Sequence, residues 1–137
     1  MTRFFNLLLA FFLLACGGST QSEQSDQTTL KEEVMAVHDE VMPKMGELRS
    51  MEKKLRAKGD SLLASDSLLA QKHIAAADAI KHANDGMMTW MRSFDPNYEG
   101  TEEEIKSYME SQKDSIEKVR DNMLQSLDSG KRLLESY

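Results

Sequence analysis

The segment LKEEVMAVHDEVMPKMGELRSMEKKL, residues 30–55, decides the fold. Its apolar residues recur at steps of three, four and seven, which places them on one face of a helix. They are Leu30, Val34, Val37, Val41, Leu48, Met51 and Leu55. Thr29 and Glu32 form a capping-box pattern, so we expect the helix to begin there. The sequence LRAKG puts basic residues in a last turn before Gly59, which predicts the helix end.

Pro43 and Gly46 interrupt this helical segment. Proline removes one backbone hydrogen bond and crowds the preceding turn of a helix. We therefore expect a kink between Asp39 and Pro43, and the alternative is two shorter helices.

Two later segments carry the same helical spacing. The first begins after a cap at Asp60 or Asp66, has a potential break at Gly86, and ends at Asp95 because the next residue is Pro96. The second begins with the capping box of Thr101-Glu102-Glu103-Glu104 and runs to the end of the chain. Their apolar positions are Leu69, Ala76, Ile80, Ala83, Met87, Trp90, Met91 and Phe94, and then Ile105, Met109, Ile116, Val119, Met123, Leu127 and Leu134.

Short connections make consecutive helices antiparallel, so residues 28–137 are predicted to form an all-α, elongated up-down-up three-helix bundle. Each helix of roughly 30 residues would be about 45 Å long. The loop 95–100 would then lie beside the start of the first helix. Four aromatic residues, Trp90, Phe94, Tyr98 and Tyr108, would gather there. We expect them to close the open end of the core, and the alternative is contact with a membrane interface.

The chain begins with a targeting segment. Arg3 precedes the apolar run FFNLLLAFFLLA, which is too short to cross a bilayer, where about 20 residues are needed. Residues 1–15 are therefore predicted to be a secretory signal peptide. The single cysteine of the chain, Cys16, follows directly.

The stretch Leu13-Leu14-Ala15-Cys16 resembles the lipobox of bacterial lipoprotein precursors. The resemblance implies cleavage before Cys16, a diacylglycerol on its sulfur and an acyl chain such as palmitate on its amino group, which together anchor a protein stably. Gly17 instead of Asp after the cysteine implies transfer to the outer membrane. Residues 16–27 are predicted to be the lipidated cysteine and a flexible linker, because they are rich in Gly, Ser and Gln.

Composition argues against nucleic acid as a partner. The chain has 17 basic and 23 acidic residues. Without Arg3 the domain has 16 basic and 23 acidic side chains, a formal charge of −7. Such a domain is repelled by nucleic acid and by anionic lipid, and no basic patch offsets this charge.

A stripe of soft ligands suggests one candidate site. Met35, His38, Met42 and Met45 follow one another at helical spacing, and the second predicted helix adds Met87, Met88 and Met91. Counting back from a turn at Gly59 places Met35 opposite Ala83 and His38 opposite Ile80, within a turn of His82 and Met87. Thioethers and imidazoles select Cu(I) or Ag(I), and a tryptophan nearby can add a cation–π contact. The alternative is that these methionines only fill the core.

Other sites have weaker support. Asp78, His82 and Asp85 share a helix face and could hold a zinc-like ion, but ordinary ion pairs within the helix are the expected outcome. His38 and Asp39 are neighbours on a helix, about 100° apart, and are not expected to form a catalytic dyad. No phosphate loop, nucleophile elbow or haem-attachment motif is present, so we expect no enzyme activity.

The stretches VMAVHDEVMPKMGELRSMEKKL and MMTWMRSFDP resemble small exported helical lipoproteins, some of which carry the label viral A-type inclusion protein. The resemblance covers most of the domain and implies a helical fold, but no activity and no site residues. The leading hypothesis is a lipid-anchored, non-enzymatic module of the cell envelope that binds a protein or another envelope component. The alternative is a soft-metal binding protein with copper as its ligand.

Overall fold

The computed structural model describes residues 19–136, with side chains from residue 28 onward. This part of the chain contains four helices and no strand. They are α1 (Ser19–Val41), α2 (Lys44–Leu62), α3 (Ser67–Ser93) and α4 (Glu102–Glu135). The predicted all-α bundle is confirmed, with its first rod divided into α1 and α2.

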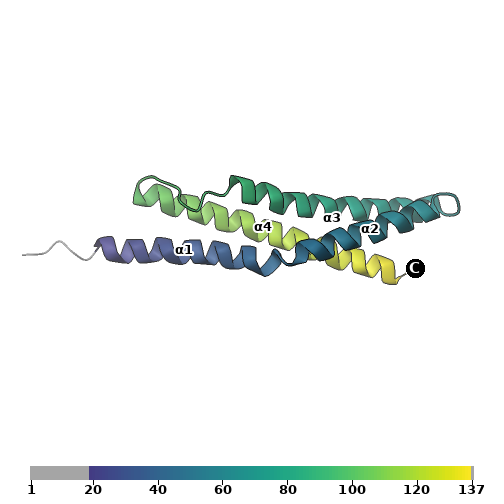
Figure 1. The fold of residues 1–137 in the computed structure, drawn as a ribbon, viewed down its shortest axis with the longest axis horizontal. Coiled ribbons are helices and arrows are strands. Elements are labelled where there is room, and N and C mark those ends of the chain that lie inside the picture. Colours follow the sequence, from purple (N-terminus) through teal and green to yellow (C-terminus); the bar gives the residue numbers. More distant parts are fainter. Residues whose placement is uncertain (1–18, 137) are drawn as a thin grey trace, which may run out of the picture.

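The division between α1 and α2 lies at Met42 and Pro43, which form a turn. Pro43 has no N–H to donate, so the regular helical ladder stops, and the Met45 N–H instead donates to the Met42 carbonyl over 3.2 Å. The prediction that Pro43 bends or splits the first helix is confirmed (Figure 1). The bend also changes partners, because α1 packs along α4 whereas α2 packs mainly on α3.

The bundle is elongated, with α1 and α2 running one way, α3 returning and α4 running back again (Figure 1). The start of α1 and the loop between α3 and α4 lie at one end. The turn between α2 and α3 lies at the other end, beside the end of α4. The predicted position of the 95–100 loop beside the first helix is confirmed.

The predicted helix start at Thr29 is wrong, because α1 begins at Ser19. Residues 19–27, expected in the linker, have helical backbone. No Gly or Pro interrupts them, and adding a turn to an existing helix avoids the cost of a new nucleus. The signal peptide and Cys16 lie outside the described residues. Within residues 19–136, no helix has both the length and the apolar character needed to span a membrane.

The predicted helix end at Gly59 is wrong, and the potential break at Gly86 does not occur. Gly59 does not end α2, which continues to Leu62, and α3 runs through Gly86 without a break. Gly59 is buried, and a Cβ there would lie 2.8 Å from Ile74 Cγ1 and 3.1 Å from the Ala70 carbonyl oxygen. Its missing side chain therefore allows α2 and α3 to pack closely, which is a different role from ending a helix.

The core lies along the axis of the bundle. Its fully buried side chains come from all four helices, and His73 is buried with them, its Nδ1 2.9 Å from the Leu69 carbonyl oxygen. The largest are Leu48, Leu55, Ile80, Met87, Ile116, Met123, His73, Val34 and Val41. Most of the apolar positions predicted from the spacing are therefore core residues.

Side chains cap the starts of α3 and α4 as predicted. The Asp66 carboxylate accepts a hydrogen bond from the Leu69 N–H at 3.0 Å. At α4, the Thr101 hydroxyl accepts from the Glu104 N–H, and the Glu104 carboxylate accepts from the Thr101 N–H at 2.8 Å. Each of these bonds gives a partner to a backbone N–H that has no hydrogen-bond acceptor within the helix itself.

Loss of this capping box should cost stability. We expect Thr101→Ala to lower the free energy of unfolding by about 1 kcal/mol, measured by chemical denaturation. The bonds from Thr101 hold the pKa of Glu104 below its ordinary value of 4.5. The Glu104 contribution is therefore present above pH 4.5 and is lost as the pH falls below it. The Thr101→Ala protein should lose less stability than the wild type between pH 5 and pH 3, and equal losses would contradict the assignment.

Candidate functional site

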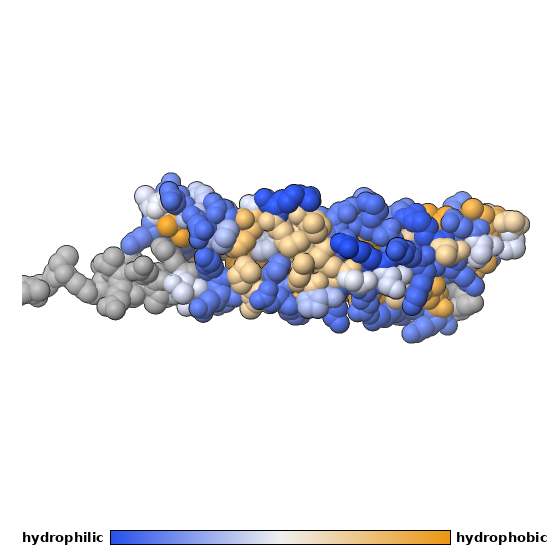
Figure 2. Space-filling view, viewed as in Figure 1, coloured by the Kyte–Doolittle hydropathy of each residue, from blue (hydrophilic) through white to orange (hydrophobic). Residues whose placement is uncertain are grey.

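One of the predicted soft-metal residues, His38, lies at the α1–α3 seam, which we define as the line where side chains of α1 and α3 meet. Both helices pack on α4, but their backbones barely approach each other. Side chains cross the gap instead, and the His38 ring lies 5.8 Å from the Trp90 ring between centroids. Figure 2 shows a continuous, weakly hydrophobic surface over the region where α1 meets α2, below α3.

The methionines of the predicted ladder have two different environments. Met87 is fully buried and Met45 is 5% exposed, so both fill the core. Met42 is 39% exposed. The other three, Met35, Met88 and Met91, are half-buried. Core packing therefore explains part of the pattern, and the remaining methionines are partly accessible to solvent.

The register predicted across the seam is wrong by almost three helical turns. The His38 ring contacts the Trp90 ring, whereas counting from Gly59 predicts Ile80 as the residue opposite His38. The turn between α2 and α3 covers residues 63–66, not the segment after Gly59. Because the turn comes later in the sequence, each residue of α1 lies opposite a later residue of α3 than predicted. His38 therefore lies next to Trp90.

The 100° angle between His38 and Asp39, on which the expectation of no catalytic dyad was based, does not keep their side chains apart. His38 Nδ1 lies 2.8 Å from Asp39 Oδ1, with the His38 side chain 16% exposed and that of Asp39 72% exposed. Nδ1 sits close to the backbone, so a short rotation of the aspartate side chain overcomes the angle between the two positions. Because an ionised carboxylate only accepts, Nδ1 carries the proton and the lone pair of neutral His38 is on Nε2.

The four predicted aromatic residues do gather at one end of the bundle. Trp90 stacks on Phe94 at 4.8 Å between centroids, Phe94 on Tyr108 at 6.4 Å, and Tyr108 on Tyr98 at 4.2 Å. The Tyr108 hydroxyl accepts a hydrogen bond from the Asp95 N–H at 2.7 Å. Trp90 is 4% exposed, and its buried Nε1 has no hydrogen-bond partner. The cluster closes this end of the core, as predicted.

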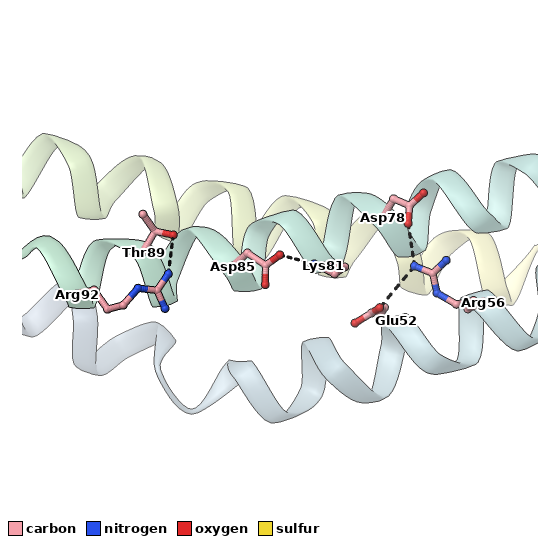
Figure 3. A network of polar contacts seen from close by, with 7 residues as sticks. All are labelled: Glu52, Arg56, Asp78, Lys81, Asp85, Thr89 and Arg92. Carbon is pink, nitrogen blue, oxygen red and sulfur yellow. Dashed lines mark hydrogen bonds and ion pairs between the residues drawn. The ribbon is translucent and has the colours of Figure 1, made fainter.

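The acidic face of α3 is occupied by ion pairs (Figure 3). Asp78 Oδ1 lies 2.8 Å from the Arg56 guanidinium of α2, and Asp85 pairs with Lys81 one turn earlier at 2.5 Å. The expected pairing within the helix is confirmed for Asp85, whereas Asp78 pairs across to α2. Among residues 28–136, no group of three His, Cys, Asp or Glu side chains is placed to hold a metal ion.

An apolar tip, not predicted from the sequence, lies at the far end of the bundle. Leu63 is 54% exposed and Leu68 is 66% exposed, the highest values among the large hydrophobic side chains that the structure describes. Both flank the turn between α2 and α3. The signal was present in the two Leu-Leu pairs of DSLLASDSLLA, because a helix end can bury only one member of each pair.

A groove of about 420 Å³ lies between α3 and α4. Small side chains form its α3 wall, and polar ones form much of its α4 wall. Its lining includes Ala76, Ala79, Ala83, Gly86, Asn122 and Ser129. Met88 and Met91 are not among the lining residues, and the helical spacing places them on the opposite flank of α3.

No protein-family model matches this chain. No curated protein and no solved structure matches it either. The resemblance to small exported helical lipoproteins stays a prediction from the residues quoted above.

Proposed function

We propose that the protein is a lipid-anchored, non-enzymatic helical module of the cell envelope that binds another envelope protein through the tip between α2 and α3. The observation that carries this proposal is the joint exposure of Leu63 and Leu68. Leu62 and Leu69 are half-buried beside them and extend the apolar surface. Exposed large apolar groups that cluster, with polar residues around them, are typical of protein interaction sites.

The distance from the anchor favours a protein over the anchoring membrane as the partner. Together α1 and α2 contain 42 residues, 23 and 19, so the tip stands about 60 Å from the start of α1. With lipid on Cys16, the start of α1 is near the membrane and the tip is far from it. The leucines would then meet a second molecule in the envelope.

The charge around the tip indicates the chemistry of this partner. Asp60 and Asp66 flank the exposed leucines, and residues 59–71 contain no Lys or Arg. An apolar pocket with a basic rim would complement this surface, because it buries the leucines and pairs with the two carboxylates. We therefore expect the partner to present a hydrophobic pocket edged by Lys or Arg.

Site-specific crosslinking tests this proposal. A photoreactive amino acid at position 68 should capture one predominant protein in intact cells, and Leu63→Ser with Leu68→Ser should weaken binding of that protein at least tenfold, because two apolar anchors are lost. Leu124→Ser is the matched control, since Leu124 is 37% exposed on α4. The double variant should melt like the wild type. Equal capture from positions 68 and 124, or an unchanged affinity, would overturn the proposal.

A further inference from the structure

The α1–α3 seam has a composition that packing alone does not require. On α1, Val34 and Val41 are fully buried in the core. The helical spacing places His38 on the flank of α1 next to them, and Met42 follows in the turn after α1. On α3, the groove with α4 occupies one flank, and Met88 and Met91 lie on the other. The contact between His38 and Trp90 shows that these two flanks face each other.

His38 is prepared to act as a ligand. Its Nδ1 donates to the Asp39 carboxylate over 2.8 Å, which leaves the Nε2 lone pair available. Histidines that bind metal ions commonly donate their other nitrogen to a carboxylate, which orients the ring and raises its basicity. The His38 side chain is 16% exposed, so an ion from solution can reach a largely sheltered site.

Thioether sulfurs are available on both sides of the seam. Met42 follows His38 by four residues, in the turn directly after α1, and its N–H still donates to the His38 carbonyl oxygen at 2.9 Å. This helical spacing lets the two side chains converge on one ion. Met91 follows Trp90 directly, on the flank of α3 that faces α1. Met42 is 39% exposed and Met91 is half-buried, so neither sulfur is locked in the core.

We propose that the α1–α3 seam binds one Cu(I) ion through His38 Nε2 and the sulfurs of Met42 and Met91, with Trp90 beside it. Soft thioethers and imidazole select Cu(I) over Mg²⁺ or Ca²⁺, which prefer oxygen ligands. The indole face of Trp90 adds a cation–π contact. Asp39 is a positioning residue, because it acts on the ion through His38. The site does not depend on the binding of a partner at the tip.

Silver titration is the direct test, because Ag(I) has the same ligand preference and does not change oxidation state under these conditions. Trp90 is the only tryptophan, so its emission reports on this site alone. In the purified protein we expect Ag(I) to change the Trp90 emission and to saturate at one equivalent. Cu(I), titrated without oxygen against a competing chelator, should bind with a dissociation constant below one micromolar.

Conservative variants separate coordination from packing. Met42→Leu with Met91→Leu keeps the side-chain volume, so the fold should hold while Cu(I) affinity falls at least tenfold. Met51→Leu with Met123→Leu is the matched control, since both of these methionines are core residues outside the seam. Asp39→Ala should weaken Cu(I) about 10-fold to 100-fold, as loss of such a supporting carboxylate usually does.

Each result supports or overturns the site. Equal Cu(I) affinity in the two double variants would mean that the seam methionines are not ligands. Unchanged Trp90 emission with one equivalent of Ag(I) bound would place the ion elsewhere. Absence of binding tighter than micromolar would end the proposal. Crosslinking at the tip is read separately, so failure of one proposal does not imply failure of the other.

Discussion

Replacing Gly59 with leucine should lower the free energy of unfolding by about 3 kcal/mol, as expected for severe overpacking. A Cβ at this position already meets Ile74 Cγ1 at 2.8 Å and the Ala70 carbonyl oxygen at 3.1 Å. The carbonyl oxygen belongs to the backbone, so a rotamer change cannot remove the conflict. Relief requires α2 to move away from α3, where these helices pack most extensively. Chemical denaturation followed by circular dichroism measures the loss.

Gly46 provides the matched control, because it also lies in α2 and a Cβ there meets nothing within 4 Å. Gly46→Leu should raise stability by up to about 1 kcal/mol, since glycine is a poor helix former. If Gly59→Leu were as stable as Gly46→Leu, the close approach of α2 to α3 would be incorrect. The two variants thus compare the same substitution in α2 at a position packed against α3 and at a position with open space around it.

Replacing Trp90 with alanine should lower the free energy of unfolding by about 3 to 5 kcal/mol. Trp90 is 4% exposed and stacks on Phe94, which continues to Tyr108. Its removal leaves a cavity at the end of the core and breaks the contact that joins α1 to α3. Circular dichroism is the required readout, because the variant has no tryptophan fluorescence.

Tyr98→Ala serves as the comparison for Trp90→Ala. Tyr98 is the outermost ring of the same stack and is 37% exposed. Its loss should cost about 1 kcal/mol, the usual value of a single aromatic pair. Similar losses for the two variants would show that the stack is not organised around a buried tryptophan.

Much of the fold follows from local patterns in the sequence. The apolar spacing of residues 30–55 predicts buried Val34, Val41, Leu48 and Leu55, and all four are fully buried. The capping box at Thr101 predicts the start of α4 within one residue. Such signals succeed because the cap and the apolar face both depend on residues within a few turns of each other.

The register between helices depended on a feature that is not local. Glycine ends helices often, so Gly59 after basic residues was a reasonable stop signal. In the structure, Gly59 lets α3 pack closely against α2. This contact joins residues of two helices, so the sequence around Gly59 does not indicate it. A difference of a few residues at the turn then displaced the whole of α3, which is why His38 was placed opposite Ile80 and not Trp90.

Side-chain geometry at the candidate sites was harder to predict. An average angle between helix neighbours does not describe a short aspartate that rotates towards Nδ1 of His38. The tip was missed for a different reason: Leu63 and Leu68 fit a helical pattern, and their exposure depends on where α2 ends and α3 begins. Both errors come from details at helix ends, where sequence signals are weakest.

The bend at Pro43 gives each half of the first rod its own attachment. Since α1 has α4 as its one extensive neighbour, it can separate at a lower cost than α2, which packs on both α3 and α4. A ligand that contacts both α1 and α3 would link these two helices, whose backbones make few direct contacts with each other. Docking of α1 and occupancy of the gap would then be linked equilibria, so each would strengthen the other.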